Sequence, residues 1–186
     1  MEKAIAINSD TIFIEQESMK VLYFITRSDT VGGAQIHVRD LALSMIEAGH
    51  QVMVIVGGKG IYYDILIQNN IPVMPIMNLK RKIDFFSDFK VIISFYNILK
   101  SFKPDVISLH SVKSGLIGRI SSFIYRKSKV IYTAHGWSHI RTALGRKKQF
   151  YIFIERWLQA VSDKVITVCD VDRDYAIEVI KIPHHK

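Results

Sequence analysis

Residues 20–37 read KVLYFITRSDTVGGAQIH, and this stretch contains the transition that decides the fold. Its first seven residues are mostly apolar and rich in β-forming side chains, which predicts a buried strand. An amphipathic pattern then covers residues 34–48, and Gly49 after it predicts the end of a helix. Gly32 and Gly33 therefore lie where a strand is followed by a helix.

The rest of the chain repeats this alternation. Short apolar runs predict further strands at residues 51–58, 71–76, 105–110, 129–135 and 164–168. Amphipathic segments between them predict helices at residues 61–70, 83–102, 114–125, 147–161 and 171–180. Strands that alternate with helices, several of them apolar throughout, are typical of a parallel sheet covered on both faces. The sequence therefore predicts an α/β fold with a Rossmann-like, doubly wound and mainly parallel sheet.

The chain has 186 residues, enough for one domain with a sizeable core. We expect residues 19–186 to form a single Rossmann-like domain and residues 1–18, which stand outside the alternation, to be a disordered extension. Neither a run of 18 apolar residues nor a secretory signal occurs, which predicts a cytoplasmic protein. The single cysteine, Cys169, excludes an internal disulfide and a zinc site built from paired cysteines.

Positive charge is concentrated in one part of the chain. The formal net charge is +8, and residues 80–148 hold fifteen Lys and Arg against three acids. This predicts nucleic acid, an acidic membrane surface or a phosphorylated substrate as partner, unless the charge only solvates the surface. No nucleic-acid-binding motif accompanies the charge, so we expect no nucleic acid. Two segments combine bases with aromatics, residues 79–103 and 145–157. Such a combination is typical of helices that lie on an anionic bilayer, but the apolar side chains could equally pack on the sheet.

Parallel sheets bind ligands at the carboxyl ends of their strands, so the loops after the predicted strands are candidate sites. The first of these loops carries Gly32 and Gly33. Glycine can adopt a positive φ and has no Cβ, so a phosphate can approach the backbone amides at the start of the next helix. We therefore predict a phosphate-binding loop formed by Gly32 and Gly33, with Arg27 as its cation. The alternative is a tight turn without a ligand.

The loops after the fourth and fifth predicted strands carry further candidates. His110 and Lys113 follow the fourth strand and can bind a sugar hydroxyl or a phosphate. His135 is expected to act as a general base or a hydrogen-bond donor, because the ordinary histidine pKa lies near neutral pH. It precedes Gly136, where the backbone changes direction, and Trp137, which can stack on a sugar ring. The alternative has His135 bonded to the backbone and Trp137 in the core.

Four stretches together resemble the opening of a family 4 glycosyltransferase of the GT-B type, in the style of bacterial enzymes that build capsular, O-antigen or exopolysaccharide sugars. They are residues 20–58, 103–120, 130–137 and 162–177. The resemblance covers about residues 20–186 and implies one half of a GT-B fold. It implies retaining transfer from a nucleotide-sugar donor, without a cofactor and without a metal.

The resemblance also implies roles for the candidate residues. Gly32 and Gly33 would face the diphosphate of the donor and the acceptor. His135 would lie near the transferred sugar and is the candidate catalytic residue. The acceptor side would be formed by four residues, His110, Lys113, Gly136 and Trp137.

The departure from the family pattern lies at the end of the chain. Family members carry a pair of glutamates in a C-terminal donor-binding domain, and no such pair occurs before the last residues, KIPHHK. We therefore expect the donor domain to be absent here and supplied in cis or in trans, and this chain alone to show no appreciable transfer. The expected partners are a glycan or lipid-linked sugar acceptor and the anionic inner face of the cell membrane.

Two alternatives stay open at this point. The chain is a non-catalytic subunit of a split glycosyltransferase, or it is another Rossmann-like nucleotide-sugar enzyme such as an epimerase. A dinucleotide-dependent dehydrogenase is disfavoured, because a GxGxxG motif and an acidic residue at the end of the second strand are both absent.

Overall fold

The computed structural model describes residues 17–79 and 84–186, in which six strands form one sheet. The strands are β1 (Lys20–Arg27), β2 (Gln51–Gly57), β3 (Val73–Pro75), β4 (Val106–His110), β5 (Lys129–Ala134) and β6 (Lys164–Thr167). Their order is β3-β2-β1-β4-β5-β6, and every neighbouring pair is parallel. This arrangement confirms the predicted α/β fold.

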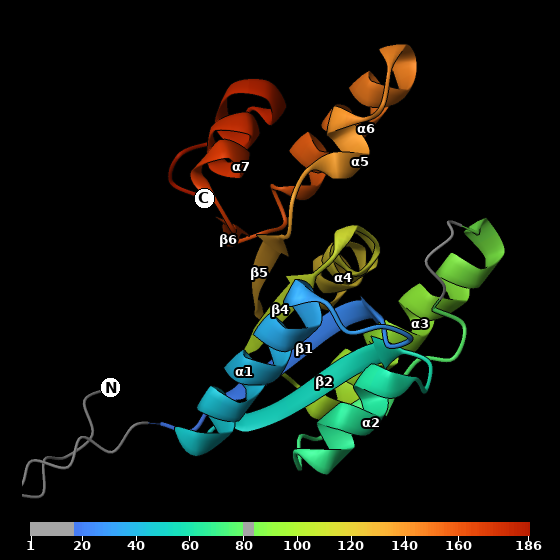
Figure 1. The fold of residues 1–186 in the computed structure, drawn as a ribbon, viewed down its shortest axis with the longest axis vertical. Coiled ribbons are helices and arrows are strands. Elements are labelled where there is room, and N and C mark those ends of the chain that lie inside the picture. The colour runs from blue at the N-terminus through green and yellow to red at the C-terminus, as the bar shows by residue number, and fades with distance from the viewer. Residues whose placement is uncertain (1–16, 80–83) are drawn as a thin grey trace, which may run out of the picture.

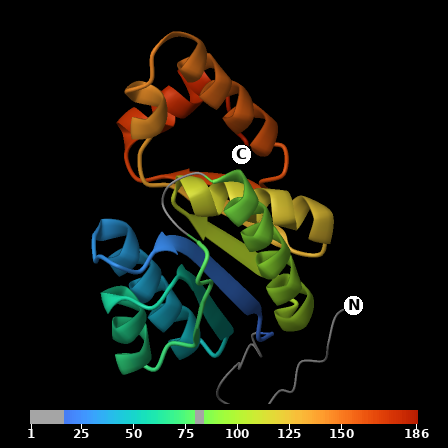
Figure 2. The same ribbon diagram turned by 90° about the vertical axis from the view of Figure 1, so that its right-hand side faces the viewer.

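Helices cover both faces of the sheet. They are α1 (Gly33–Glu47), α2 (Ile61–Gln68), α3 (Phe85–Phe102), α4 (Val112–Tyr125), α5 (Ser138–Arg141), α6 (Gly145–Leu158) and α7 (Asp170–Tyr175), which continues into the π-helical turn η1 (Ala176–Ile180). Helices α1 and α2 pack on one face and α3 and α4 on the other, as Figures 1 and 2 show.

Several helix boundaries differ from the sequence prediction. Helix α4 begins at Val112 rather than at Ser114, so Ser114 lies in its first turn. The four-residue helix α5 was not predicted, and the last predicted helix is divided into α7 and η1. Two predicted features lie partly outside the described residues. The first is the extension, of which residues 1–16 are not described. The second is the segment 80–83, which holds the bases Lys80, Arg81 and Lys82 and the first residue of the helix predicted at 83–102.

The core has two layers because the side chains of a strand alternate between the faces of the sheet. In β1, Leu22 and Phe24 face the layer that contains α3 and α4, whereas Tyr23 and Ile25 face α1 and α2. Phe24 stacks on Phe95 of α3, with 4.2 Å between the ring centroids. The apolar run in β1 is therefore buried on both faces, as expected for a central parallel strand.

Helix α4 lies especially close to the sheet. A Cβ added to Gly115 would lie 2.5 Å from a ring carbon of Tyr132, and one added to Gly118 would overlap a leucine side chain of β4. The same helix buries Arg119, whose Nη2 lies 2.9 Å from Oε2 of Glu155 on α6. The position of α4 thus depends on two small residues and on one buried ion pair.

The sheet has a topological switch point between β1 and β4. These strands are neighbours, but the helices that follow them, α1 and α4, lie on opposite faces. The chain therefore diverges at the carboxyl ends of β1 and β4. In open α/β sheets this divergence is where ligands bind.

Candidate functional site

Gly32 and Gly33 lie at the switch point and are exposed at the start of α1. Gly32 has a φ of −137°, and neither glycine is among the residues with positive φ, so the loop does not use the ability of glycine to adopt one. A Cβ on Gly32 would lie 3.5 Å from Oε1 of Gln35, an ordinary contact, and one on Gly33 would meet no described atom within 4 Å. Neither the backbone nor the packing of the described chain therefore requires glycine here.

The first turn of α1 presents backbone N–H groups at this edge. A helix leaves its first N–H groups without a partner inside the helix. The N–H of Gly32 donates to Oε1 of Gln35 at 3.2 Å, but among the described residues no side chain caps the N–H groups that follow. Together with the positive end of the helix dipole, these groups form a place that favours an anion.

Arg27, the predicted cation of the loop, is paired within the loop. Its guanidinium donates to both carboxylate oxygens of Asp29, at 3.0 and 3.1 Å. The Asp29 carboxylate therefore offsets much of the charge that a phosphate would meet. An anion at Gly32 and Gly33 would rely on the helix N–H groups more than on Arg27.

A hydroxyl network joins β1 to α4 beside the glycine loop. Oγ1 of Thr26 lies 2.7 Å from Oγ of Ser111, which lies 2.8 Å from Oγ of Ser114. The Ser114 hydroxyl donates to the carbonyl of His110, and the Ser114 N–H donates to Thr26 Oγ1. Ser111 has a φ of 104° and a ψ of 157°, a region that costs a residue other than glycine about 1–3 kcal/mol. The network thus holds a strained residue at the switch point.

Three histidines from separate elements gather at the same edge. His37 comes from α1, His110 ends β4 and His135 follows β5, with ring centroids 5.4 to 5.7 Å apart. Nδ1 of His110 lies 3.1 Å from Nε2 of His135, and Nε2 of His110 lies 2.8 Å from Oγ of Ser108. Ser108 and His110 share one side of β4 because they are two residues apart in a strand.

Burial keeps two of these rings neutral. Desolvation, with smaller contributions from His135 and His37, lowers the pKa of His110 from 6.5 to about 3. Desolvation and then His37 also lower the pKa of His135. Both side chains are therefore uncharged at neutral pH. Within the described ranges, no group of three His, Cys, Asp or Glu side chains is arranged to hold a metal ion.

Trp137 is not available to stack on a sugar. The residue is 1% exposed, belongs to the main core cluster, and its Nε1 donates to the carbonyl of Asp172 at 2.9 Å. The predicted stacking role is therefore wrong, and the alternative of a core tryptophan is confirmed. Gly136 has a φ of 109° and turns the chain from β5 toward α5, which explains why glycine occupies this position.

Two other predicted acceptor contacts also change in the structure. His110 is 0% exposed, so the predicted direct contact with an acceptor is wrong. Lys113 is 8% exposed, and its Nζ lies 2.6 Å from Oδ1 of Asp88 on α3. In the structure this lysine serves an ion pair between α3 and α4 rather than the predicted acceptor contact. His135 is only half-buried and keeps its candidacy.

The sequence prediction missed Ser108 and gave His37 no role. A signal for Ser108 was available, because a polar residue two positions before His110 must share its side of the strand. The position of His37 could not be inferred locally, since it depends on α1 lying on the side of the sheet that His110 faces.

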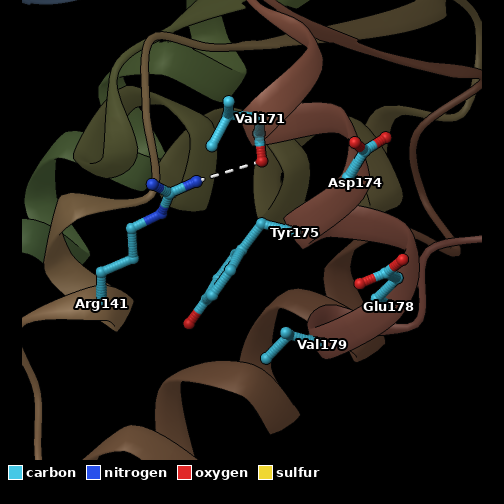
Figure 3. Close-up of a pocket in the computed structure, with 6 residues that line it drawn as sticks. All are labelled: Arg141, Val171, Asp174, Tyr175, Glu178 and Val179. Atoms are coloured by element: carbon cyan, nitrogen blue, oxygen red, sulfur yellow. Dashed lines mark hydrogen bonds between the residues drawn. The ribbon is translucent and has the colours of Figure 1, made fainter.

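A separate cavity of about 350 Å³ lies among the segments that follow β5 and β6 (Figure 3). It is lined by Arg141, Val171, Asp174, Tyr175, Glu178 and Val179. Arg141 donates to the carbonyl of Val171 at 3.1 Å, pairs with Asp172 at 2.9 Å and covers the ring of Tyr175. The guanidinium is thus engaged by the walls of the cavity, and the glycine loop after β1 is not part of its lining.

Comparison with known proteins gives one family model and several bacterial glycosyltransferases. Residues 31–186 match the model of Glycosyltransferase Family 4. The chain is 29% identical over 104 residues to a UDP-Gal:alpha-D-GlcNAc-diphosphoundecaprenol alpha-1,3-galactosyltransferase of Escherichia coli, covering 56% of this chain and 27% of that protein. It is 27% identical over 168 residues to the O-antigen biosynthesis glycosyltransferase WbnH of Escherichia coli, covering 90% of this chain and 47% of that protein.

A solved structure agrees with the fold. The glycosyltransferase from Rickettsia africae superposes with a TM-score of 0.70 at 18% identity, over 92% of this chain and 42% of that one. The chain thus spans about half, or less, of the length of the relatives that it matches.

Proposed function

Because the chain belongs to glycosyltransferase family 4, we propose that it forms the acceptor-side half of an enzyme that moves a sugar from a nucleotide-sugar donor to a glycan acceptor. The relatives named for O-antigen synthesis and for a diphosphoundecaprenol-linked substrate support a role in cell-surface polysaccharide synthesis and a lipid-linked acceptor. Family membership also favours sugar transfer over the alternative of an epimerase. The donor half would come from a second domain, in cis or in trans.

One observation carries this proposal: Gly32 and Gly33 stand at the switch point although the described chain has no need of them. A Cβ at Gly33 would meet no described atom within 4 Å, and one at Gly32 would make only an ordinary contact with Gln35. Gly32 also suits its place as the N-cap of α1, but Gly33 has no such role, and glycine there is useful if something outside this half must come close to the backbone. A diphosphate fits, because its oxygens can accept hydrogen bonds from the N–H groups at the helix start.

We place the chemistry of transfer across the cleft between this half and the donor half. The leaving diphosphate would be stabilised by helix N-termini and basic side chains, as in other sites that preorganise donors for developing charge, so we expect no metal and no cofactor. His135 would approach the transferred sugar from this side. Transfer by the purified chain alone would contradict the proposed division of labour.

A binding measurement tests the proposal directly. The probe is a water-soluble, short-chain polyprenyl diphosphate sugar, titrated into the wild-type chain and into Gly33→Ala by isothermal calorimetry. We expect Gly33→Ala to weaken binding about tenfold, the loss of roughly one hydrogen bond to a charged group. Ser44→Ala, an exposed change later in the same helix, is the matched control and should leave the affinity unchanged.

The outcome depends on the diphosphate as well as on the glycine. The same sugar without its diphosphate should bind far more weakly to the wild type, and its affinity for Gly33→Ala should equal its affinity for the wild type. Equal affinity of the wild type and Gly33→Ala for the diphosphate probe would refute the proposed role of the loop.

Two helices suggest how a lipid-linked acceptor would be reached. Helices that connect parallel strands run back across the sheet, so α3 and α6 both begin at its carboxyl edge. At the start of α3, Phe85 and Phe86 are 82% and 80% exposed, and α6 exposes Phe150 and Phe153. The first turn of α6 adds three bases, Arg146, Lys147 and Lys148.

These parts of α3 and α6 would associate with an anionic membrane at its periphery. Exposed aromatics at the headgroup boundary and nearby bases are what such binding needs. Within the described residues, no helix combines the length and apolar character needed to span a bilayer. The proposed location is therefore the inner face of the cell membrane.

Liposome sedimentation tests this second element. We expect binding to vesicles with anionic lipid to fall at high salt and to fall about tenfold or more when Arg146, Lys147 and Lys148 are all changed to Gln, at about 1 kcal/mol per base. The control removes equal charge at the opposite edge, with Lys100, Lys103 and Lys127 changed to Gln. Equal losses from both triple variants would mean that only net charge matters and would contradict a docking surface on α6.

A further inference from the structure

The half-buried ring of His135 is held by a hydrogen-bonded chain that starts inside the sheet. Ser108 Oγ lies 2.8 Å from Nε2 of His110, and Nδ1 of His110 lies 3.1 Å from Nε2 of His135. Ser108 is 7% exposed and His110 is completely buried. His37 lies edge-on to both other rings, and Tyr23 of β1 lies 5.9 Å from His110 between ring centroids. The rings of His110 and His135 are therefore held in place by hydrogen bonds and by the neighbouring rings.

The direction of these hydrogen bonds follows from counting protons. A neutral imidazole has one N–H and one lone pair, so His110 must donate at one nitrogen and accept at the other. Ser108 has no other side-chain partner in the described part of the chain. If Ser108 only accepted from His110, its own hydroxyl hydrogen would be buried without a partner, which is unfavourable. The Ser108 hydroxyl is therefore the donor, and Nε2 of His110 accepts.

The same count then fixes the next link. With Nε2 accepting, the proton of His110 is on Nδ1, and it donates to Nε2 of His135. Nε2 of His135 therefore uses its lone pair, which leaves the proton of that ring on Nδ1. The low pKa of His110 supports this assignment, because a charged His110 would donate from both nitrogens and could not accept from Ser108.

We propose that Ser108 and His110 are positioning residues that hold His135 as the neutral tautomer with its proton on Nδ1. In that state His135 is a hydrogen-bond donor and cannot serve as a general base through Nε2. Nδ1 has no partner in the described ranges and is not among their buried unpaired atoms, so it reaches solvent. Its partner would be an oxygen acceptor, a sugar hydroxyl or a phosphate oxygen. This last assignment rests on the proposed function, whereas the tautomer does not.

The tautomer can be read by nuclear magnetic resonance on the free chain. Long-range 1H–15N correlation spectra of the histidine-labelled protein distinguish the two neutral forms, and His135→Gln identifies the signals of residue 135. The spectra are recorded at about pH 8, well above the ordinary histidine pKa. We expect the Nδ1–H form of His135 in the wild type. An Nε2–H form would overturn the proposal.

Variants of Ser108 and His110 test whether the hydrogen-bonded series of side chains sets the tautomer of the His135 ring. Ser108→Ala removes the donor to His110, so the tautomer ratio of His135 should move about tenfold or more toward Nε2–H. Ser108→Thr keeps the hydroxyl and should keep the wild-type ratio. His110→Asn places an amide N–H near the former Nδ1 and should also keep it, which provides a second test if the threonine does not fit. An unchanged ratio in Ser108→Ala would refute the positioning role.

Failure of this inference can be told apart from failure of the proposed function. Adding the polyprenyl diphosphate sugar to the labelled chain should shift the Nδ1–H signal of His135. A correct tautomer without any response to the probe would retain the positioning chain and reject the ligand. A response to the probe from a His135 ring with its proton on Nε2 would support the ligand and reject the positioning role of Ser108 and His110.

Discussion

Two pairs of glycines in this molecule occupy opposite environments. On α4, a Cβ at Gly115 or Gly118 would run into buried side chains of the sheet. At the start of α1, a Cβ at Gly32 would make one ordinary contact and a Cβ at Gly33 would meet no described atom within 4 Å. The first pair is explained completely by the packing of the chain. The second pair has no such explanation, and a ligand that approaches the backbone supplies one.

The same difference separates the polar groups of the two regions. Beside α4, Arg119 and Glu155 are buried and form an ion pair, although Nη1 of Arg119 has no hydrogen-bond partner among the described residues. At the switch point, the first N–H groups of α1 have no capping side chain among the described residues, and Nδ1 of His135 reaches solvent. The first region is thus closed, because its charged groups are paired inside the chain, and the second is open, because it presents hydrogen-bonding groups to solvent. Changes in the first should alter stability, and changes in the second should alter binding.

The largest expected effect lies in the closed region. Glu155→Ala leaves Arg119 charged and buried without its partner, which should lower the free energy of unfolding by about 3–5 kcal/mol. Urea denaturation measures this loss. Gln149→Ala, an exposed change on the same helix, should be near neutral. A loss below about 1 kcal/mol would mean that solvent reaches the ion pair and that this region is less closed than it looks.

A smaller loss is expected from Gly118→Ala. Its Cβ would overlap Leu109, which is fully buried and cannot move aside without disturbing the core. Overpacking of this kind lowers the free energy of unfolding by about 1–3 kcal/mol. Ile124→Ala on the exposed side of α4 is the control. If Gly118→Ala were neutral, packing would not explain the glycine at this position, and the contrast between the two glycine pairs would fail.

The fold could be predicted because it depends on local patterns. Apolar runs of strand length alternate with amphipathic segments along the whole chain, and that alternation specifies a parallel sheet. Helix α5 escaped prediction because four residues are too few to show a period. The division between α7 and η1 escaped because a π-helical turn leaves no distinct hydrophobic spacing.

The site could be predicted only in part, because its residues are placed by contacts between distant segments. The glycine loop was found from its position after β1, although neither glycine adopts a positive φ. Trp137 looked like a sugar-stacking residue because its hydrogen-bond partner, Asp172, is 35 positions away in sequence. The burial of His110 likewise depends on α1 covering that side of β4. Such relations are tertiary, and no local pattern encodes them.

The histidines lie at the switch point, but His110 is fully buried there, and pH tests how well its ring is closed off from water. His110 has an ordinary pKa in the unfolded chain and a pKa of about 3 in the folded one, so the unfolded state binds more protons below pH 6.5. Stability should therefore fall as the pH falls, by about 2 kcal/mol between pH 6.5 and pH 5. His135, whose pKa is also lowered, acts in the same direction.

The measurement compares urea denaturation of the wild type and His110→Gln from pH 8 to pH 5. The variant lacks the titrating ring, so its free energy of unfolding should rise relative to that of the wild type as the solution becomes more acidic. His184→Gln, an exposed change near the C-terminus, should leave the wild-type profile unchanged. Parallel profiles for wild type and His110→Gln would show that water reaches the His110 ring, which would make His110, like His135, part of the open region.

The smallest expected effect on stability is the one that completes the comparison. Gly33→Ala should change the free energy of unfolding by less than about 0.5 kcal/mol, because the new methyl group meets no described atom within 4 Å and alanine is a good helix former. Gly32→Ala should cost up to about 1 kcal/mol, because Gly32 is the N-cap of α1, a position that prefers glycine to alanine. The same variants should bind the diphosphate probe about tenfold more weakly. A loss of stability above about 1 kcal/mol would place Gly32 and Gly33 in the same class as Gly118. The glycines would then be explained by folding, and the argument for a ligand at this loop would have no support left in the structure.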